Sequence, residues 1–270
     1  MKKLIVVSLV VLVSVFANTA LAGVPLNNLE GVGGIAFNPL AYTAGTAGDS
    51  NSSFGDILSK PQIGIWNIHL HEVGIDWTTF GVAETLFKRV ELSYGHETIG
   101  WSNHKTIDKD NFGTKALLLP ESDVLPAISI GGVWKQTTQE VFDTKNSGAD
   151  YYLVGTKLVK ALPLPVLLSG GVLSTQGQTL GVLGFNDSRK EVLFGNVDVL
   201  PLSNVAVGFE YRQGAHYDDF KNADYWDTHV AWFVNPNLTL VAAYVYTGDK
   251  ESTSKVGLGD GVVLSIQYAF

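Results

Sequence analysis

Apolar and polar residues alternate along most of this 270-residue chain, with the two-residue period of a half-buried β-strand. Residues 90–95, 205–212 and 226–234 show this most clearly, with apolar side chains on one face and small or ionisable ones on the other. Helical periodicity is weak by comparison. The pattern predicts about twelve strands, within a range of about 10 to 14. They lie near residues 61–70, 74–87, 90–99, 112–119, 127–136, 150–161, 165–175, 190–200, 205–213, 223–233, 237–247 and 260–270.

The connections between these segments alternate in length. Short turns lie at 88–89, 162–165, 200–204 and 234–237, and long polar loops at 101–110, 137–149, 176–189, 214–222 and 248–259. This order brings the short turns to one end and the long loops to the other, as in outer-membrane barrels. A soluble β-sandwich gives no reason for one-sided loops. The sequence therefore predicts an all-β, antiparallel, up-and-down transmembrane β-barrel, with a periplasmic sandwich as the alternative.

The N-terminal region predicts export. Lys2 and Lys3 precede an apolar run over 4–16, and residues 20–22 form the small-x-small pattern of a cleavage site. The run is shorter than the roughly 20 residues of a spanning helix. We expect a cleavable signal peptide over 1–22, an N-terminal segment over 23–60 and the barrel over 61–270. Residues 31–42 are expected to form an extra strand or a plug in the pore, and residues 44–59 are expected to form a flexible linker.

The amino-acid composition is also informative about the class of protein. The chain has no cysteine, so no disulfide stabilises it in an oxidising compartment. Without Lys2 and Lys3 it keeps 16 Lys and Arg against 26 Asp and Glu, a charge of −10 that disfavours nucleic acid as a partner. The six tryptophans fall on predicted strands or at their ends, which is typical of the aromatic girdles of membrane barrels. They are Trp66, Trp77, Trp101, Trp134, Trp226 and Trp232.

The chain ends in "VLSIQYAF", in which Leu264, Ile266, Tyr268 and Phe270 share one face. This face is predicted to meet outer-membrane lipid. The ending resembles the C-terminal signal of bacterial outer-membrane barrels, and the resemblance implies recognition by the barrel assembly machinery through strand pairing. The stretches "LEGVGGIAFNPLAY" (29–42) and "LFKRVELSYGHE" (86–97) are similar to a Gram-negative family of unknown function. That resemblance implies a barrel and no activity.

Ionisable residues on the strands are predicted to face the lumen, because Lys or Arg facing lipid near the midplane costs about 2–4 kcal/mol. This placement supports two interpretations: a polar conduit that selects solutes weakly, or a salt-bridged interior that stabilises a closed barrel. The alternation places Lys135, Lys157 and Asp198 inward, together with the lumen and selectivity candidates Glu91, Glu97, Lys115, Glu210, Arg212, Asp227 and His229.

The sequence offers little catalytic chemistry. No G-x-S-x-G elbow occurs, and no nucleophile has a base at local spacing. His69 and His71 share a strand face, but no third metal ligand is identifiable. The acidic stretch 216–227 lacks the ligand order of a calcium loop. We therefore predict no catalytic residue, metal or cofactor.

The leading functional hypothesis is an exported outer-membrane barrel that forms a narrow channel for small solutes through a mixed-charge lumen. A twelve-stranded barrel lies between filled eight-stranded barrels and open porins, so a narrow or plugged pore is expected. The alternative is a non-conducting structural or surface-interaction barrel. A membrane enzyme is third, because catalytic triads assemble in space rather than at fixed spacing. The oligomeric state is left open.

Overall fold

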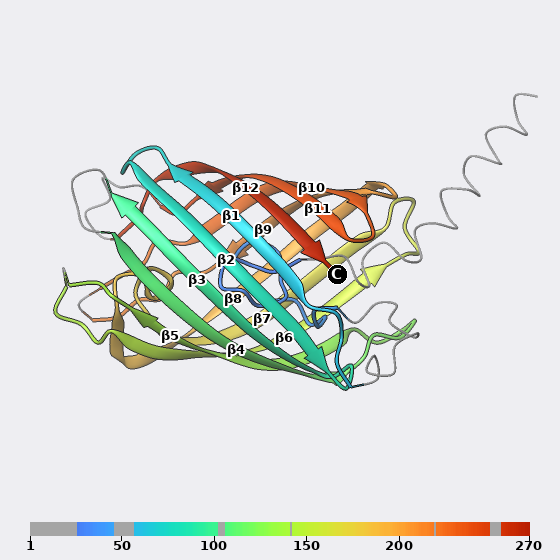
Figure 1. The fold of residues 1–270 in the computed structure, drawn as a ribbon, viewed down its shortest axis with the longest axis horizontal. Helices are drawn as coiled ribbons and strands as arrows, with labels where there is room; N and C mark the ends of the chain where they lie inside the picture. Colours follow the sequence, from blue (N-terminus) through green and yellow to red (C-terminus); the bar gives the residue numbers. More distant parts are fainter. Residues whose placement is uncertain (1–25, 46–56, 102–105, 141, 219, 249–254) are drawn as a thin grey trace, which may run out of the picture.

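The computed structural model describes residues 26–45, 57–101, 106–140, 142–218, 220–248 and 255–270 (Figure 1). The expected signal peptide over 1–22 lies outside the described residues. No helix in the described ranges is long and apolar enough to cross a membrane.

The described strands form one closed antiparallel barrel in which each strand pairs with its neighbours in the chain and the last pairs with the first. This confirms the predicted fold and strand number. The strands are β1 (Gln62–Leu70), β2 (Ile75–Leu86), β3 (Val90–Trp101), β4 (Ile107–Leu119), β5 (Ala127–Thr137), β6 (Ser147–Val159), β7 (Val166–Gly177), β8 (Phe185–Leu202), β9 (Val205–Arg212), β10 (Tyr225–Asn235), β11 (Leu238–Tyr246) and β12 (Asp260–Ala269), with one 3₁₀ turn, η1 (Thr179–Gly181).

Two strands begin five residues before their predicted starts. The prediction began β4 at 112 and β8 at 190, whereas they begin at Ile107 and Phe185. In the added part of β4, Lys109 points inward while Asp108 and Asp110 point outward. Both faces of this part of β4 are therefore polar, so the sequence shows no apolar alternation and predicts a loop.

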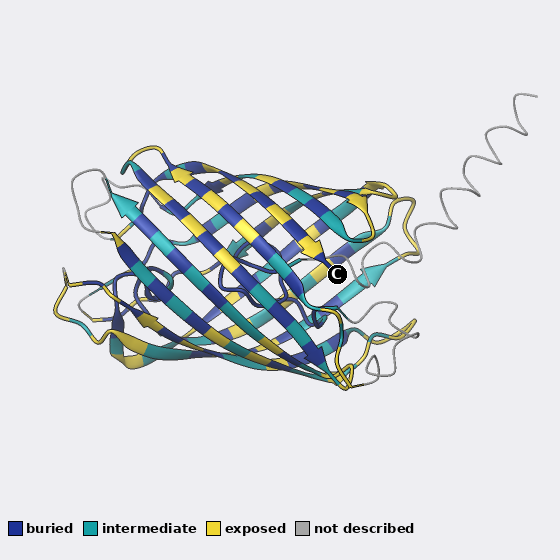
Figure 2. Cartoon of the chain, viewed as in Figure 1, coloured by how far each residue is buried: buried dark blue, intermediate teal, exposed yellow. Residues whose placement is uncertain are grey.

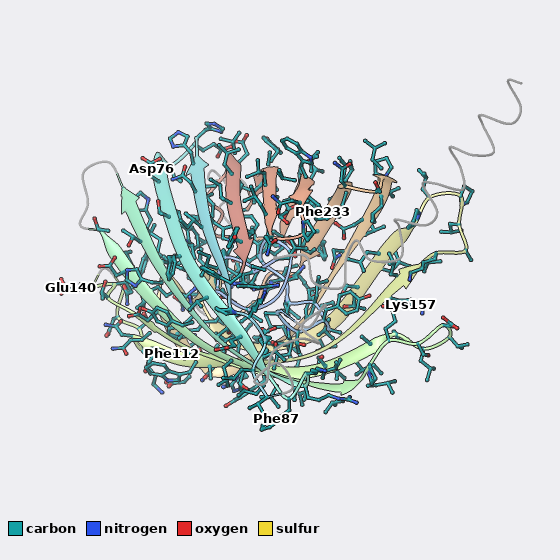
Figure 3. All side chains as sticks on the ribbon, turned by 45° about the vertical axis from the view of Figure 1, so that its right-hand side comes forward. Asp76, Phe87, Phe112, Glu140, Lys157 and Phe233 are labelled. Atoms are coloured by element: carbon teal, nitrogen blue, oxygen red, sulfur yellow. The ribbon has the colours of Figure 1, made fainter. Side chains whose placement is uncertain are left out.

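The connections define two ends of the barrel. The short-turn end carries the connections at 87–89, 120–126, 160–165, 203–204 and 236–237, and the long-loop end carries those at 71–74, 102–106, 138–146, 178–184, 213–224 and 247–259. The turn at 71–74 is the short exception at the long-loop end. Asp76 and Phe87, labelled in Figure 3, mark the two ends of β2.

Buried and exposed residues alternate along the strands (Figure 2), and many of the exposed ones are large and apolar. Trp226 belongs to an outward aromatic group near the long-loop end, where its ring centroid lies 5.4 Å from that of Tyr246. Three of the tryptophans assigned to the girdle face inward instead: Trp66 is 1% exposed, Trp77 is 4% exposed, and Trp101 packs against the apolar interior. Their part of the interior is apolar, so large rings pack there.

Residues 26–45, which we call the inner segment, lie inside the barrel and are drawn in blue in Figure 1. Inward glycines allow this close packing, since Gly64, Gly81 and Gly95 lie side by side on β1, β2 and β3. A Cβ at Gly81 would lie 2.9 Å from Gly31 Cα. Gly31 itself has a φ of 85°, which glycine adopts without strain.

Candidate functional site in the charged lumen

The structure places all seven lumen candidates inside the barrel, each at most 3% exposed. Asp198 and Lys135 are also inward and buried, as expected. Lys157 is not: the inward residues of β6 include Val154 and Thr156, so Lys157 faces outward. Its ammonium lies 3.2 Å from a Glu121 carboxylate oxygen at the short-turn end, where Figure 3 labels it. The prediction for Lys157 is wrong because the cost of an outward lysine applies near the membrane midplane, whereas Lys157 lies two residues from the end of β6.

The C-terminal residues face away from the lumen. Leu264, Ile266, Tyr268 and Phe270 are all exposed on the outside, with Leu264 62% exposed, while Ser265 and Gln267 are buried inside. This geometry is compatible with lipid contact. Recognition by an assembly machinery remains a prediction.

Glu91 and Lys115 form a buried ion pair that holds the inner segment. They face each other across β3 and β4, and their charged atoms lie 2.9 Å apart. Glu91 accepts hydrogen bonds from the backbone N–H groups of Gly33 and Ala44, both at 2.8 Å. Lys115 donates to the Gly33 carbonyl at 2.9 Å. The pair therefore fixes the backbone of the inner segment at two separate points.

A larger network surrounds Glu30 of the inner segment. Lys135 binds Glu30 and also Asp150 at 2.6 Å, while Lys109 lies 3.5 Å from Glu30 and 2.7 Å from Glu97. Burial by itself raises the pKa of Glu30, but the two ammonium groups outweigh it and lower that pKa to about 2. Glu30 is therefore a carboxylate at neutral pH.

Three members of this network were not predicted from the sequence. Lys109 lay in a stretch assigned to a loop, Asp150 at a predicted strand start, and Glu30 in a segment whose place was undecided. One signal was available for Lys109: residues 109, 111, 113 and 115 continue the inward face of β4 at period two. Glu30 has no such signal, because its segment follows no strand register.

Glu210 and Arg212 bind a second stretch of the inner segment. The Glu210 carboxylate accepts three backbone N–H bonds, from Ala36 at 3.1 Å, Phe37 at 3.0 Å and Asn38 at 2.8 Å. Arg212 donates to the Asn38 side-chain oxygen at 3.0 Å and to the Phe37 carbonyl. Consecutive N–H groups that converge on one carboxylate make a strong, directional anchor.

His229 lies between two carboxylates. Its Nδ1 is 2.6 Å from Asp227 and its Nε2 is 2.7 Å from Asp198. Both ring nitrogens are occupied, and these contacts include no Ser, Thr or Cys that the imidazole could activate. The arrangement therefore stabilises the lumen and lacks the parts of a nucleophilic triad.

The buried ionisable residues are acid-rich. The acids are Glu30, Glu91, Glu97, Asp150, Asp198, Glu210 and Asp227; the bases are Lys109, Lys115, Lys135, Arg212 and His229. Among the described residues the buried acids therefore outnumber the buried bases seven to five.

The remaining candidates for metal binding lie outside the lumen. The His69 and His71 rings meet edge to face with centroids 5.2 Å apart, and both side chains are about half exposed. His69 pairs with Asp76 at 2.7 Å. Among the described residues no group of three His, Cys, Asp or Glu is arranged to hold a metal ion.

A closed antiparallel barrel with apolar side chains outside and charged ones inside defines the class of outer-membrane β-barrels. A family model described as "Protein of unknown function (DUF3034)" matches residues 23–267, and the chain belongs to this family. The resemblance to a family of unknown function is thereby confirmed. No curated protein sequence matches the chain.

Two solved porins share the fold. The KdgM porin aligns with a TM-score of 0.53 and 13% identity over 77% of this chain and 99% of that one. A second structure of it, "in complex with disordered oligogalacturonate", gives the same values. The NanC porin aligns with a TM-score of 0.51 and 11% identity over 77% of this chain and 98% of that one. At these identities the likeness shows the fold alone.

Proposed function

We propose that the protein is a small-solute channel of the bacterial outer membrane, closed in this structure by the inner segment. The location is supported by the exposed apolar side chains on the barrel wall and by the confinement of the buried charges to its interior. The porin-like fold agrees with it. On this proposal the outward C-terminal residues contact lipid and provide the pairing strand for assembly.

The observation that carries the channel proposal is how the inner segment is held. The wall is complete without it, because β1 pairs with β12 along its whole length. Glu91, Lys115, Glu210 and Arg212 bind the segment largely through its backbone atoms. Water can replace such bonds when the segment leaves, and the vacated wall would then be lined by hydrated charges, as a polar conduit requires.

The charge of the lumen points to the kind of solute. With seven acids against five bases in the lumen, an open pore of this sequence would pass cations more readily than anions. The KdgM porin has been solved with oligogalacturonate, an acidic oligosaccharide. We propose that this chain differs in selectivity and takes small neutral or cationic solutes.

Planar-bilayer recording of the full-length protein tests the proposal. We expect rare openings from the wild type and a higher open probability from Glu210→Gln, because the amide accepts the three N–H bonds less strongly. Open channels should prefer K⁺ to Cl⁻. Glu191→Gln is the matched control, since Glu191 is an exposed outward residue of β8. Absence of conductance from both wild type and Glu210→Gln, across voltages, would overturn the channel.

A second candidate is a non-conducting structural barrel, and one observation favours it. Lys109, Lys115 and Lys135 are fully buried, and each lies within ion-pair distance of at least one carboxylate. A tightly paired interior of this kind can serve rigidity alone. It predicts no conductance from the Glu210→Gln variant and a lower unfolding temperature for it.

A further inference from the structure

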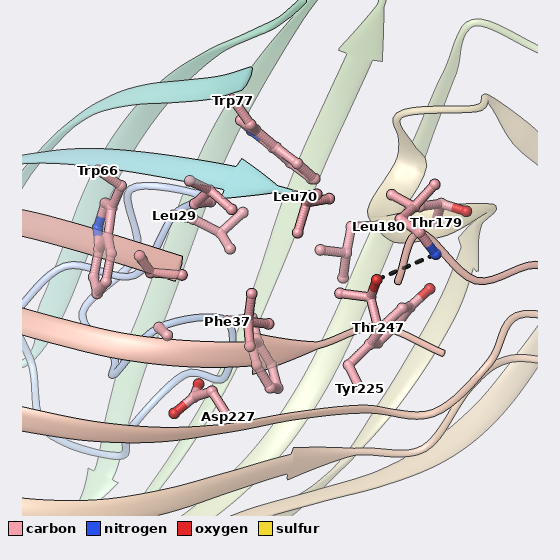
Figure 4. Close-up of a pocket in the computed structure, with 15 residues that line it drawn as sticks. Leu29, Phe37, Trp66, Leu70, Trp77, Thr179, Leu180, Tyr225, Asp227 and Thr247 are labelled. Atoms are coloured by element: carbon pink, nitrogen blue, oxygen red, sulfur yellow. Dashed lines mark hydrogen bonds between the residues drawn. The ribbon is translucent and has the colours of Figure 1, made fainter. Parts of the chain in front are cut away.

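A cavity with about 40 Å³ of free volume lies inside the barrel, towards the long-loop end. Figure 4 shows its walls: Leu29 and Phe37 from the inner segment, Trp66 and Leu70 from β1, Trp77 from β2 and Leu180 from the loop at 178–184. The cavity adjoins the charged network, because Glu210 and Arg212 bind the backbone of Phe37 and Asp227, the partner of His229, also lines the cavity.

The atoms that face this cavity are apolar, although Thr179, Asp227 and Thr247 also line it. A water molecule needs two to four polar partners to be held in a buried site, and apolar cavities stay dry and take up apolar molecules instead. Aromatic rings form a large part of the walls, and they offer flat faces and edges to another ring. The occupant that this chemistry favours is an aromatic ring or a short alkyl group.

The loop that closes the cavity is strained. Thr179 has a φ of 48° and Leu180 a φ of 60°, so two consecutive residues other than glycine adopt the left-handed region. For a β-branched residue such as threonine this is a true outlier, and strain of this kind gathers at ligand clamps and switch regions. A hydrogen bond from Thr179 N–H to the Asn222 side-chain oxygen, at 2.7 Å, holds the tip in place.

We propose that this cavity is a binding site for a small apolar molecule, entered from the long-loop end when Leu180 swings away. The closed volume of about 40 Å³ is smaller than the cavity of about 150 Å³ that holds benzene in an engineered protein. A ring therefore enters only with displacement of the Leu180 side chain. Release of the left-handed strain at Thr179 and Leu180 offsets part of the cost. The site does not depend on whether the barrel conducts.

Photolabelling with 3-trifluoromethyl-3-phenyldiazirine tests the site on the full-length protein in phosphatidylcholine vesicles. The probe also dissolves in lipid, but β12 distinguishes the two locations, because Val263 points into the cavity and its neighbour Leu264 points outward. We expect adducts on Val263 as well as Leu264. Toluene in excess should reduce labelling of Val263 about tenfold and leave Leu264 labelled.

Two substitutions fill the cavity from opposite sides. Ala36→Phe from the inner segment and Val245→Phe from β11 should each abolish labelling of Val263, whereas Ala242→Phe on the outer face of β11 should not. Leu180→Gly should raise the labelling rate several-fold, because glycine removes both the obstructing side chain and the left-handed strain. Labelling confined to Leu264 and other outward residues, or inward labelling that persists in both filled variants, would overturn the proposal.

Discussion

The inner wall of the barrel has two unlike parts. Strands β3–β6 and β8–β10, which we call the charged wall, carry the buried Asp, Glu, Lys, Arg and His residues of the strands. Strands β11, β12, β1 and β2, which we call the uncharged wall, present no ionisable side chain to the interior among the described residues. Its inward residues are apolar, such as Ile68 and Val263, or neutral and polar, such as Gln267.

The two walls hold the inner segment by different physical means. The charged wall binds its backbone through directional, charge-assisted hydrogen bonds, which are stronger than neutral ones. The uncharged wall packs against its side chains and adds a few neutral hydrogen bonds, such as Trp66 Nε1 to the Asn27 carbonyl at 2.8 Å. The comparison predicts that loss of charge releases the segment, whereas changes in the uncharged wall weaken it only slightly.

The largest effect is expected from the double variant Glu91→Ala/Glu210→Ala. It leaves five backbone N–H groups without their acceptor and Lys115 without its partner. Each substitution should lower the free energy that holds the inner segment by about 3 kcal/mol or more. The inner segment should leave the lumen, and chymotrypsin should then cleave after Phe37 and Tyr42. Glu191→Ala is the control. Continued protection of both sites in the folded double variant would mean that the charged wall is not the anchor.

A smaller effect is expected from Gly95→Leu, which tests close packing rather than charge. A Cβ at residue 95 would lie 2.6 Å from the Glu30 carbonyl carbon, so the segment must shift, at about 1–3 kcal/mol. Chymotrypsin cleavage should increase while heat-modifiable migration of the barrel stays unchanged. The control is Gly155→Leu, where a Cβ would face outward with its nearest neighbour at 3.8 Å. Equal cleavage of the two variants would contradict the packing argument.

Trp66→Phe tests how strongly the uncharged wall holds the inner segment. It keeps a large ring and removes one neutral hydrogen bond, so we expect a loss of about 1 kcal/mol in the free energy that holds the segment. Trp232→Phe is matched to it on the outer surface and should change nothing measurable by chymotrypsin protection. A loss as large as that of the Glu91→Ala/Glu210→Ala variant would erase the distinction between the two walls.

The pH dependence of Glu30 tests the charged wall by titration instead of substitution. Its pKa is lowered from 4.5 to about 2, so its contribution is fully present above about pH 4.5 and is lost as the pH falls towards 2. The charges that face it are Lys109, Lys135, Arg212 and Glu97. The difference in open probability between wild type and Glu30→Gln should be constant above pH 4.5 and vanish near pH 2. A difference that grows on acidification would reverse the sign of this contribution.

The sequence predicts the barrel wall well because the alternation of residues, the loop lengths and the cost of a lipid-facing charge can all be read from neighbouring positions in the chain. The strand number and the inward placement of residues such as Glu210 and His229 follow from it. The inner segment is different. Its position in the lumen depends on hydrogen bonds between residues far apart in the sequence, such as Asn38 and Glu210, and local periodicity does not predict such bonds. The inward turn of Trp66 and Trp77 also depends on what fills the lumen.

A reversible crosslink tests most directly whether the inner segment closes the lumen. A Cβ at Gly113 of β4 would lie 3.0 Å from Val32 Cγ2 of the inner segment, close enough for a disulfide, and the chain has no cysteine of its own. The variant Val32→Cys/Gly113→Cys, with Ser93→Ala to make room, should be silent in a planar bilayer when oxidised and should open at least as often as the wild type when reduced. Equal conductance in the oxidised and reduced states would contradict the account.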